Sequence, residues 1–302
     1  MQVPSFPVTI TDGACQSFGQ QREPHMSLTH LGLIGCGAIA HTLLGALCDS
    51  AGGAPQRIGV LARSGSGDRV RAALNAIAGL RHSTLSVVTD LNALMDDRPD
   101  VVVECAGQQA LVQNGAAVLA RGCDLIVASV GALADDRLLD DLRRTAKAGG
   151  AQMFIPSGAI GGIDALGAAR LSGIDSVTYT GRKPALAWVG TPAEHLLNLD
   201  RLDTAQVFFE GTARDAARQY PRNANVAATL ALAGIGMDAT RVRLIADPAA
   251  TANIHEFTVV SKAVEFTMRL TGRPSPDNPK TSLSTAYALA RTVQHRTDAF
   301  VI

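Results

Sequence analysis

The chain alternates between short, almost wholly apolar runs and longer segments whose apolar residues recur every three or four positions. Such runs are typical of strands buried on both faces of a parallel sheet, and such segments are typical of amphipathic helices. The pattern predicts strands over 29–34, 57–62, 100–104, 124–128 and 151–155, and helices over 38–48, 68–78, 108–121 and 135–148. Because strand and helix alternate throughout, we expect a doubly wound parallel sheet with ligands at the carboxyl ends of its strands.

The pattern changes after Pro156. A glycine-rich loop over 157–163 leads into a helix that ends near Leu171. Longer strands with period-two alternation follow over 176–181, 241–246, 253–262 and 264–270. They predict a second, α+β domain with a mixed or antiparallel sheet. A final helix over 283–293 would bury its apolar stripe of Leu283, Ala286 and Leu289 by returning to the first domain.

The junction between the first strand and helix reads Gly35-Cys36-Gly37-Ala38-Ile39-Ala40. This is the opening of a dinucleotide-binding βαβ unit of the Rossmann type. Gly35 allows the tight turn, and Gly37 removes the side chain where a pyrophosphate approaches the backbone. The helix that begins at Ala38 and Ile39 presents unpaired N–H groups to the phosphates. A merely structural glycine turn is the alternative, and the strand–turn–helix context favours the nucleotide.

These patterns divide the chain into domains. We assign residues 27–156 and 278–302 to a dinucleotide-binding domain and residues 157–277 to a substrate or catalytic domain. Residues 1–26 hold proline, glycine and glutamine without periodicity, and they lack the basic and apolar regions of a secretory signal. We therefore predict that residues 1–26 form a disordered extension.

Composition narrows the range of partners. The 302 residues include 27 basic and 27 acidic side chains, so the formal net charge is zero, and the basic residues are scattered. This distribution argues against nucleic acid or a membrane surface and favours a small-molecule substrate. The five cysteines form an odd set without C-x-x-C spacing, which favours a reducing cytoplasm. No cluster of histidine, cysteine and acidic residues predicts a metal site.

The carboxyl ends of the predicted strands supply candidate cofactor contacts. The second strand ends in Arg63-Ser64 without a carboxylate to bind the ribose 2′-hydroxyl of NAD, so Arg63 is placed to hold the 2′-phosphate of NADP. A solvated Arg63, or one stacked on adenine, is the alternative. The next two strand ends carry small residues that would let the backbone lie against the cofactor, and these are Cys105, Ala106, Ala128 and Ser129. We expect NADP or NAD as the cofactor.

His255 is the candidate catalytic residue among seven histidines. Alternation along its strand places Asn253, His255 and Phe257 on one face, and Ile254 and Glu256 on the other. A histidine on the cleft side of a strand has an intrinsic pKa suited to proton transfer near neutrality. A structural histidine is the alternative that this pattern leaves open.

Three blocks of the sequence together resemble the L-aspartate dehydrogenase family. They are Gly32-Leu-Ile-Gly-Cys-Gly-Ala-Ile-Ala40, Pro156-Ser-Gly-Ala-Ile-Gly-Gly-Ile-Asp-Ala-Leu166, and Asn223-Ala-Asn-Val-Ala-Ala228 with Ala252-Asn-Ile-His-Glu-Phe257. The resemblance implies oxidation of L-aspartate by NAD(P) to iminoaspartate, which yields oxaloacetate and ammonia or feeds nicotinamide cofactor synthesis. It also implies a homodimer. The family's nucleotide contacts fall on Ala159 and Asn225, and its catalytic histidine falls on His255.

Further roles depend on that resemblance. A dicarboxylate substrate needs cations, and we expect Arg182 and Lys183, after the strand over 176–181, to bind its carboxylates. Asn225 would bind the carboxamide or ribose, and capping the following helix is the alternative. Long apolar strand faces such as Phe257–Val264 would pack against a second subunit.

Two other functions stay open from the sequence. One is a related reductase of the homoserine dehydrogenase type, and the other is a dinucleotide sensor without turnover.

Overall fold

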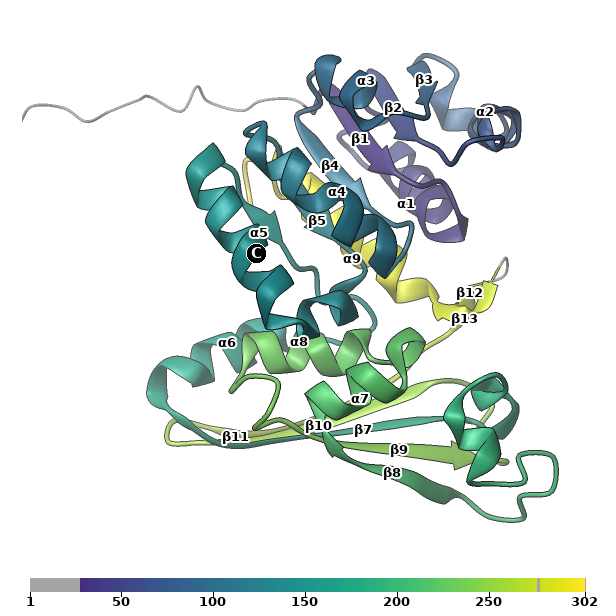
Figure 1. Ribbon diagram of the computed structural model, residues 1–302, viewed down its shortest axis with the longest axis vertical. Coiled ribbons are helices and arrows are strands. Elements are labelled where there is room, and N and C mark those ends of the chain that lie inside the picture. Colours follow the sequence, from purple (N-terminus) through teal and green to yellow (C-terminus); the bar gives the residue numbers. More distant parts are fainter. Residues whose placement is uncertain (1–27, 276–277, 302) are drawn as a thin grey trace, which may run out of the picture.

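The computed structural model describes residues 28–275 and 278–301 and contains two main sheets (Figure 1). The first sheet is wholly parallel, with strand order β3-β2-β1-β4-β5-β6. Its strands are β1 (His30–Ile34), β2 (Arg57–Leu61), β3 (Thr84–Val88), β4 (Val101–Glu104), β5 (Asp124–Val127) and β6 (Met153–Phe154). This is the doubly wound sheet that the apolar runs predict.

Helices and short 3₁₀ turns connect these strands. They are α1 (Ala38–Cys48), α2 (Gly67–Asn75), η1 (Ala78–Leu80), α3 (Leu91–Asp96), α4 (Gln108–Ala120), η2 (Val130–Ala134) and α5 (Asp136–Gly149). The predicted bounds of α1 are confirmed, and those of α4 and α5 hold to within a residue. β3 and α3 were not predicted from the sequence. β3 lies at the sheet edge and is only half-buried, so it lacks the apolar run that marks the central strands.

The second sheet is mixed, with strand order β11-β10-β7-β9-β8. Its strands are β7 (Ile174–Pro184), β8 (Gln206–Thr212), β9 (Arg241–Asp247), β10 (Ile254–Ser261) and β11 (Glu265–Thr271). β7 and β9 are parallel and the other pairs are antiparallel. The edge strand β8 and helix α7 (Ala213–Gln219), which follows it, were not predicted from the sequence.

Three helices of the described residues cover one face of the second sheet. α6 (Ile163–Ser172), α7 and α8 (Asn225–Ala233) lie between this sheet and the first domain (Figure 1). Phe257 and Val259 of β10 point to the covered face and are buried in their own subunit, so they do not form the apolar docking face that the sequence suggested. The opposite face carries polar side chains such as Thr178, Glu256 and Thr258.

The chain finally returns to the first domain. After the short hairpin of β12 (Pro274–Ser275) and β13 (Asn278–Ser282), helix α9 (Leu283–Gln294) packs against α1 and β5 (Figure 1). Ala286 and Leu289 are buried as expected, while Leu283 is only half-buried. Among the described residues, no helix is long and apolar enough to span a membrane. The extension predicted for residues 1–26 lies outside the described residues.

Leu289 should be essential to the packing of α9 on the first domain, because its side chain is fully buried there. We expect Leu289→Ala to lower the free energy of unfolding by about 2–5 kcal/mol, measured by urea denaturation. Leu171→Ala is the matched control, since Leu171 is 91% exposed and its truncation should change stability by less than about 0.5 kcal/mol. Equal effects of the two substitutions would contradict this packing.

Candidate active site

The glycine turn leaves room for a ligand at the N-terminus of α1. Gly35 has φ +84°, and a Cβ atom there would lie 2.6 Å from the Cβ atom of Ala106. A Cβ atom at Gly37 would meet nothing within 4 Å, so this position faces open space. No side chain caps the helix that begins with Ala38 and Ile39. These residues therefore fit a dinucleotide, whose pyrophosphate would take the helix N–H groups.

A pocket of about 670 Å³ opens beside this turn. It brings together five of the cofactor residues predicted from the sequence, which are Gly35, Gly37, Arg63, Cys105 and Ala106. They come from the carboxyl ends of β1, β2 and β4, which are neighbours in the sheet. This edge is where ligands bind in doubly wound sheets.

The end of β2 supplies the polar rim of the pocket. Arg63 is exposed there, and Ser64, Ser66 and Arg69 line the same pocket. A carboxylate also lines it, that of Asp90 after β3, which the sequence analysis did not consider. The rim thus offers two guanidinium groups and two hydroxyl groups to a phosphate.

Glu104 is a buried acidic residue of this site that the sequence analysis missed. Its side chain is fully buried at the end of β4. Oε1 accepts hydrogen bonds from the backbone N–H groups of Ala106 and Gly107, each at 2.8 Å, and Oε2 accepts one from the N–H of Ser129 at 3.0 Å. The Ser129 hydroxyl donates a fourth bond, to Oε1. Burial raises the pKa of Glu104, and these hydrogen bonds oppose the rise.

The contacts of Glu104 hold two strand ends together. Ala106 and Gly107 belong to the turn after β4, and Ser129 belongs to the turn after β5. Ala128 and Ser129 are buried and lie outside the pocket beside the glycine turn. In the sequence, Glu104 is an acidic residue at the end of an otherwise apolar run, and this pattern is the signal that could have identified it. A carboxylate buried at such a position needs hydrogen-bond donors around it.

The segment Pro221–Asn225 connects the two domains. The Asn225 side-chain oxygen accepts a hydrogen bond from the backbone N–H of Gly131 at 2.9 Å, and the Pro221 carbonyl oxygen accepts one from Gln108 Nε2 at 2.9 Å. Asn225 makes no capping bond at the start of α8, so the capping alternative is wrong. It instead joins α8 to the turn after β5.

His255 lies on the covered face of β10, opposite Gly181 of β7. Its Nδ1 atom forms a 2.8 Å hydrogen bond with the hydroxyl of Tyr179. Within the described part of the chain, Nε2 has no hydrogen-bond partner, and it is not enclosed. Burial, aided by the nearby positive charge of Lys183, lowers the pKa of His255 to about 4, so the imidazole is neutral at pH 7.

The two basic residues at the end of β7 point in opposite directions. Lys183 shares the covered face with Tyr179 and Gly181, and its Nζ atom donates a 2.5 Å hydrogen bond to Asn223 Oδ1. Burial lowers the pKa of Lys183 to about 8. Arg182 lies on the other face, where its guanidinium pairs with Asp247 at 2.7 Å. The structure therefore brings Lys183, and not Arg182, to the side of the sheet that holds His255.

Ala159 lies in the loop between β6 and α6, half-buried against the core of the second domain. Like Ala128, Ser129, Asn225 and His255, it does not line the pocket beside the glycine turn. Ala128 and Ser129 lie in the turn after β5, Asn225 begins α8, and His255 lies on the covered face of β10. The candidate site thus has two parts. One is the pocket at the edge of the first sheet, and the other is the region between the first domain and the covered face of the second sheet.

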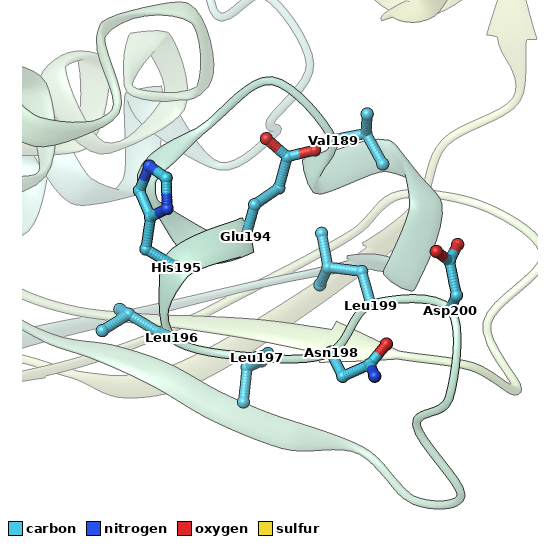
Figure 2. A pocket seen from close by; sticks show the side chains of 8 residues that line it. All are labelled: Val189, Glu194, His195, Leu196, Leu197, Asn198, Leu199 and Asp200. Atoms are coloured by element: carbon cyan, nitrogen blue, oxygen red, sulfur yellow. The ribbon is translucent and has the colours of Figure 1, made fainter.

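Another hollow, of about 490 Å³, lies on the loop between η3 (Ala185–Trp188) and β8. Glu194, His195 and Asp200 project around it (Figure 2). None of the residues predicted from the sequence lies there. Among residues 28–275 and 278–301, no group of three or more histidine, cysteine or acidic side chains is arranged to hold a metal ion.

Comparison with family models separates the two parts of the chain. Residues 35–156 match the model described as "Homoserine dehydrogenase, NAD binding domain", and residues 164–296 match the model described as "Aspartate dehydrogenase, C-terminal". A doubly wound sheet with a free glycine turn, followed by a second domain with a buried imidazole at the junction, defines a two-domain NAD(P)-dependent dehydrogenase.

Whole-chain comparisons identify the family. L-aspartate dehydrogenase of Cupriavidus necator is 45% identical over 278 residues, which cover 91% of this chain and all of that protein. L-aspartate dehydrogenase of Pseudomonas aeruginosa is 46% identical over 272 residues, which cover 89% of this chain and 98% of that protein. The chain therefore belongs to the L-aspartate dehydrogenase family. The crystal structure of aspartate dehydrogenase from Thermotoga maritima shares the fold, with a TM-score of 0.71 at 24% identity over 91% of this chain and 99% of that chain.

Glu104 should be required for the shape of the pocket. Glu104→Gln keeps the size of the side chain but puts an NH₂ group against backbone N–H donors. Leaving one buried donor unpaired should lower the free energy of unfolding by about 1–3 kcal/mol and weaken NADPH binding about tenfold, measured by fluorescence titration. Glu265→Gln, on exposed β11, is the control. Wild-type affinity in Glu104→Gln would show that the four hydrogen bonds do not shape the pocket.

Proposed function

We propose that this protein catalyses the reversible NAD(P)-dependent oxidation of L-aspartate to iminoaspartate, which hydrolyses to oxaloacetate and ammonia. The observation that carries the proposal is the buried, neutral imidazole of His255, which lies on the helix-covered face of the second sheet. Its Nδ1 atom is bonded to Tyr179, and its Nε2 atom has no hydrogen-bond partner among the described residues. Family membership supplies the substrate. A dinucleotide sensor has no need of such a group, and a homoserine dehydrogenase type of enzyme fits the second domain less well.

The proposal divides the chain as the sequence pattern does, into a dinucleotide-binding domain of residues 27–156 and 278–302 and a catalytic domain of residues 157–277. When bound, the nicotinamide ring accepts the hydride from the substrate. The residues that would hold the cofactor are Gly35, Gly37, Ala38, Ile39, Arg63, Cys105, Ala106, Ala128, Ser129, Ala159 and Asn225. The free turn at Gly37, the uncapped α1 and the small side chains along the pocket support this assignment.

We place His255 beside the α-carbon of the substrate as the catalytic residue. Its burial excludes water from that side of the reacting atoms, and its hydrogen bond to Tyr179 fixes the plane of the ring. Lys183 would bind a substrate carboxylate from the same sheet face, since Asn223 holds its ammonium group in position. Arg182 has no part in this arrangement, because Asp247 neutralises it on the opposite face.

The cellular context belongs to the same proposal. The described cysteines are all free thiols, which supports a location in a reducing cytoplasm. A homodimer, which the resemblance to the family implies, belongs to the same proposal, and light scattering would detect it. Iminoaspartate released from the site would feed nicotinamide cofactor synthesis.

The central experiment measures reduction of NADP or NAD by L-aspartate at 340 nm. His255→Ala should lower kcat by about 10²- to 10³-fold, because the substitution removes the polar group beside the reacting carbon. His195→Ala, in the hollow of Figure 2, is the control and should keep the wild-type rate. Wild-type turnover in His255→Ala would make His255 structural. An inactive wild-type protein, in both directions, would refute the proposed reaction.

Arg63 should set the preference between the two cofactors. Arg63→Ala removes an exposed guanidinium from the pocket rim, so we expect KM for NADP to rise about tenfold while KM for NAD changes less than twofold. Arg57→Ala, at the opposite end of the same strand, is a matched control. An unchanged ratio of the two KM values would remove Arg63 from cofactor recognition.

A further inference from the structure

The hydrogen bond between Tyr179 and His255 is almost completely shielded from water. The exposed fractions of the two residues are 1% and 5%. The hydroxyl oxygen lies 2.8 Å from Nδ1, and the two rings are nearly parallel, with 15° between their planes. Both residues sit on central strands of the second sheet, on the face that the helices cover. The hydrogen bond therefore fixes the Nδ1 side of the His255 ring, and the Nε2 side can contact a ligand.

The position of each hydrogen in this pair follows from the partners available. Burial raises the pKa of Tyr179, so the phenol keeps its proton. In the described residues the hydroxyl has no hydrogen-bond partner besides Nδ1 of His255. If Nδ1 carried the proton and donated it, the hydroxyl hydrogen would be buried without an acceptor, which is strongly unfavourable. The alternative, in which the hydroxyl donates to an unprotonated Nδ1, leaves no group unpaired.

We propose that Tyr179 is a positioning residue that holds neutral His255 in the tautomer with its hydrogen on Nε2, so that His255 meets the substrate as a hydrogen-bond donor. This inference rests on the proposed function for the identity of the substrate. It concerns the chemical form of the imidazole, which the function by itself leaves open.

The tautomer determines what His255 does in the reaction. An Nε2–H group cannot accept the proton of the substrate ammonium group, so L-aspartate loses that proton to water before the hydride leaves Cα. The Nε2–H group instead donates a hydrogen bond to an oxygen atom, either of a substrate carboxylate or of the hydroxyl that water forms on adding to the imine carbon. That hydroxyl adduct then loses ammonia to give oxaloacetate. Tyr179 and His255 keep their protons throughout.

The first test reads the tautomer directly by nitrogen NMR of the unliganded protein labelled with ¹⁵N-histidine. The signal of His255 is assigned by its loss in His255→Gln. At neutral pH we expect Nδ1 to resonate as an unprotonated nitrogen and Nε2 as a protonated one. A protonated Nδ1 would overturn the inference. Because the measurement needs no substrate, it stands even if the protein fails to oxidise L-aspartate.

The second test removes the hydroxyl. Tyr179→Phe should let both tautomers of His255 appear and should lower kcat about fivefold to tenfold, the range expected for one hydrogen bond, with KM for NADP unchanged. Tyr220→Phe removes another buried phenol of the same domain, 2% exposed and not bonded to His255, and should keep the wild-type spectrum and rate. A single Nε2–H tautomer in a folded Tyr179→Phe, checked by circular dichroism, would refute the positioning role.

Discussion

The junction between the domains depends on hydrogen bonds made by the short segment Pro221–Asn225. Its Pro221 carbonyl and Asn225 side chain accept hydrogen bonds from Gln108 and from the backbone of Gly131, both in the first domain. Between them, Asn223 accepts a hydrogen bond from Lys183 of the second sheet. Three of the five residues in this segment thus connect the cofactor domain to the face of the second sheet that carries His255. Hydride transfer needs the reacting atoms held at contact distance, and these hydrogen bonds are among the contacts that hold the two domains together.

The polar groups that are buried or half-buried around the site have specific partners. Glu104 accepts four hydrogen bonds from the turns after β4 and β5, Tyr179 bonds His255, and Lys183 bonds Asn223. Burial of these groups without such partners would be strongly unfavourable, so each of them constrains the backbone around it. Among the described residues, Nε2 of His255 has no hydrogen-bond partner, and a Cβ atom at Gly37 would meet nothing within 4 Å, so both positions stand apart from this network.

The sequence pattern predicts the central elements well and the peripheral ones poorly. Strands such as β4, buried on both faces, need a continuous apolar run, and α1 follows directly from a glycine turn. The edge strands β3 and β8 are exposed on part of their surface, so their sequences lack a clear period and were missed. The apolar residues of β10 were recognised, but their burial under the protein's own helices, instead of a second subunit, depends on the placement of α6 and α8.

For the site, residue order and chemical type alone determined the glycine turn, the basic end of β2, the small residues after β4 and the face of β10 on which His255 lies. These are local features, because a turn and a two-residue period require no knowledge of distant contacts. Only the tertiary structure decided the rest. It extended β7 to Pro184 through pairing with β9, so that Arg182 and Lys183 face opposite sides of the sheet, and it gave Arg182 Asp247 as a partner. It also buried Glu104 among four donors and joined Tyr179 to His255 across 76 positions of sequence, because such pairings arise only when separate strands pack side by side.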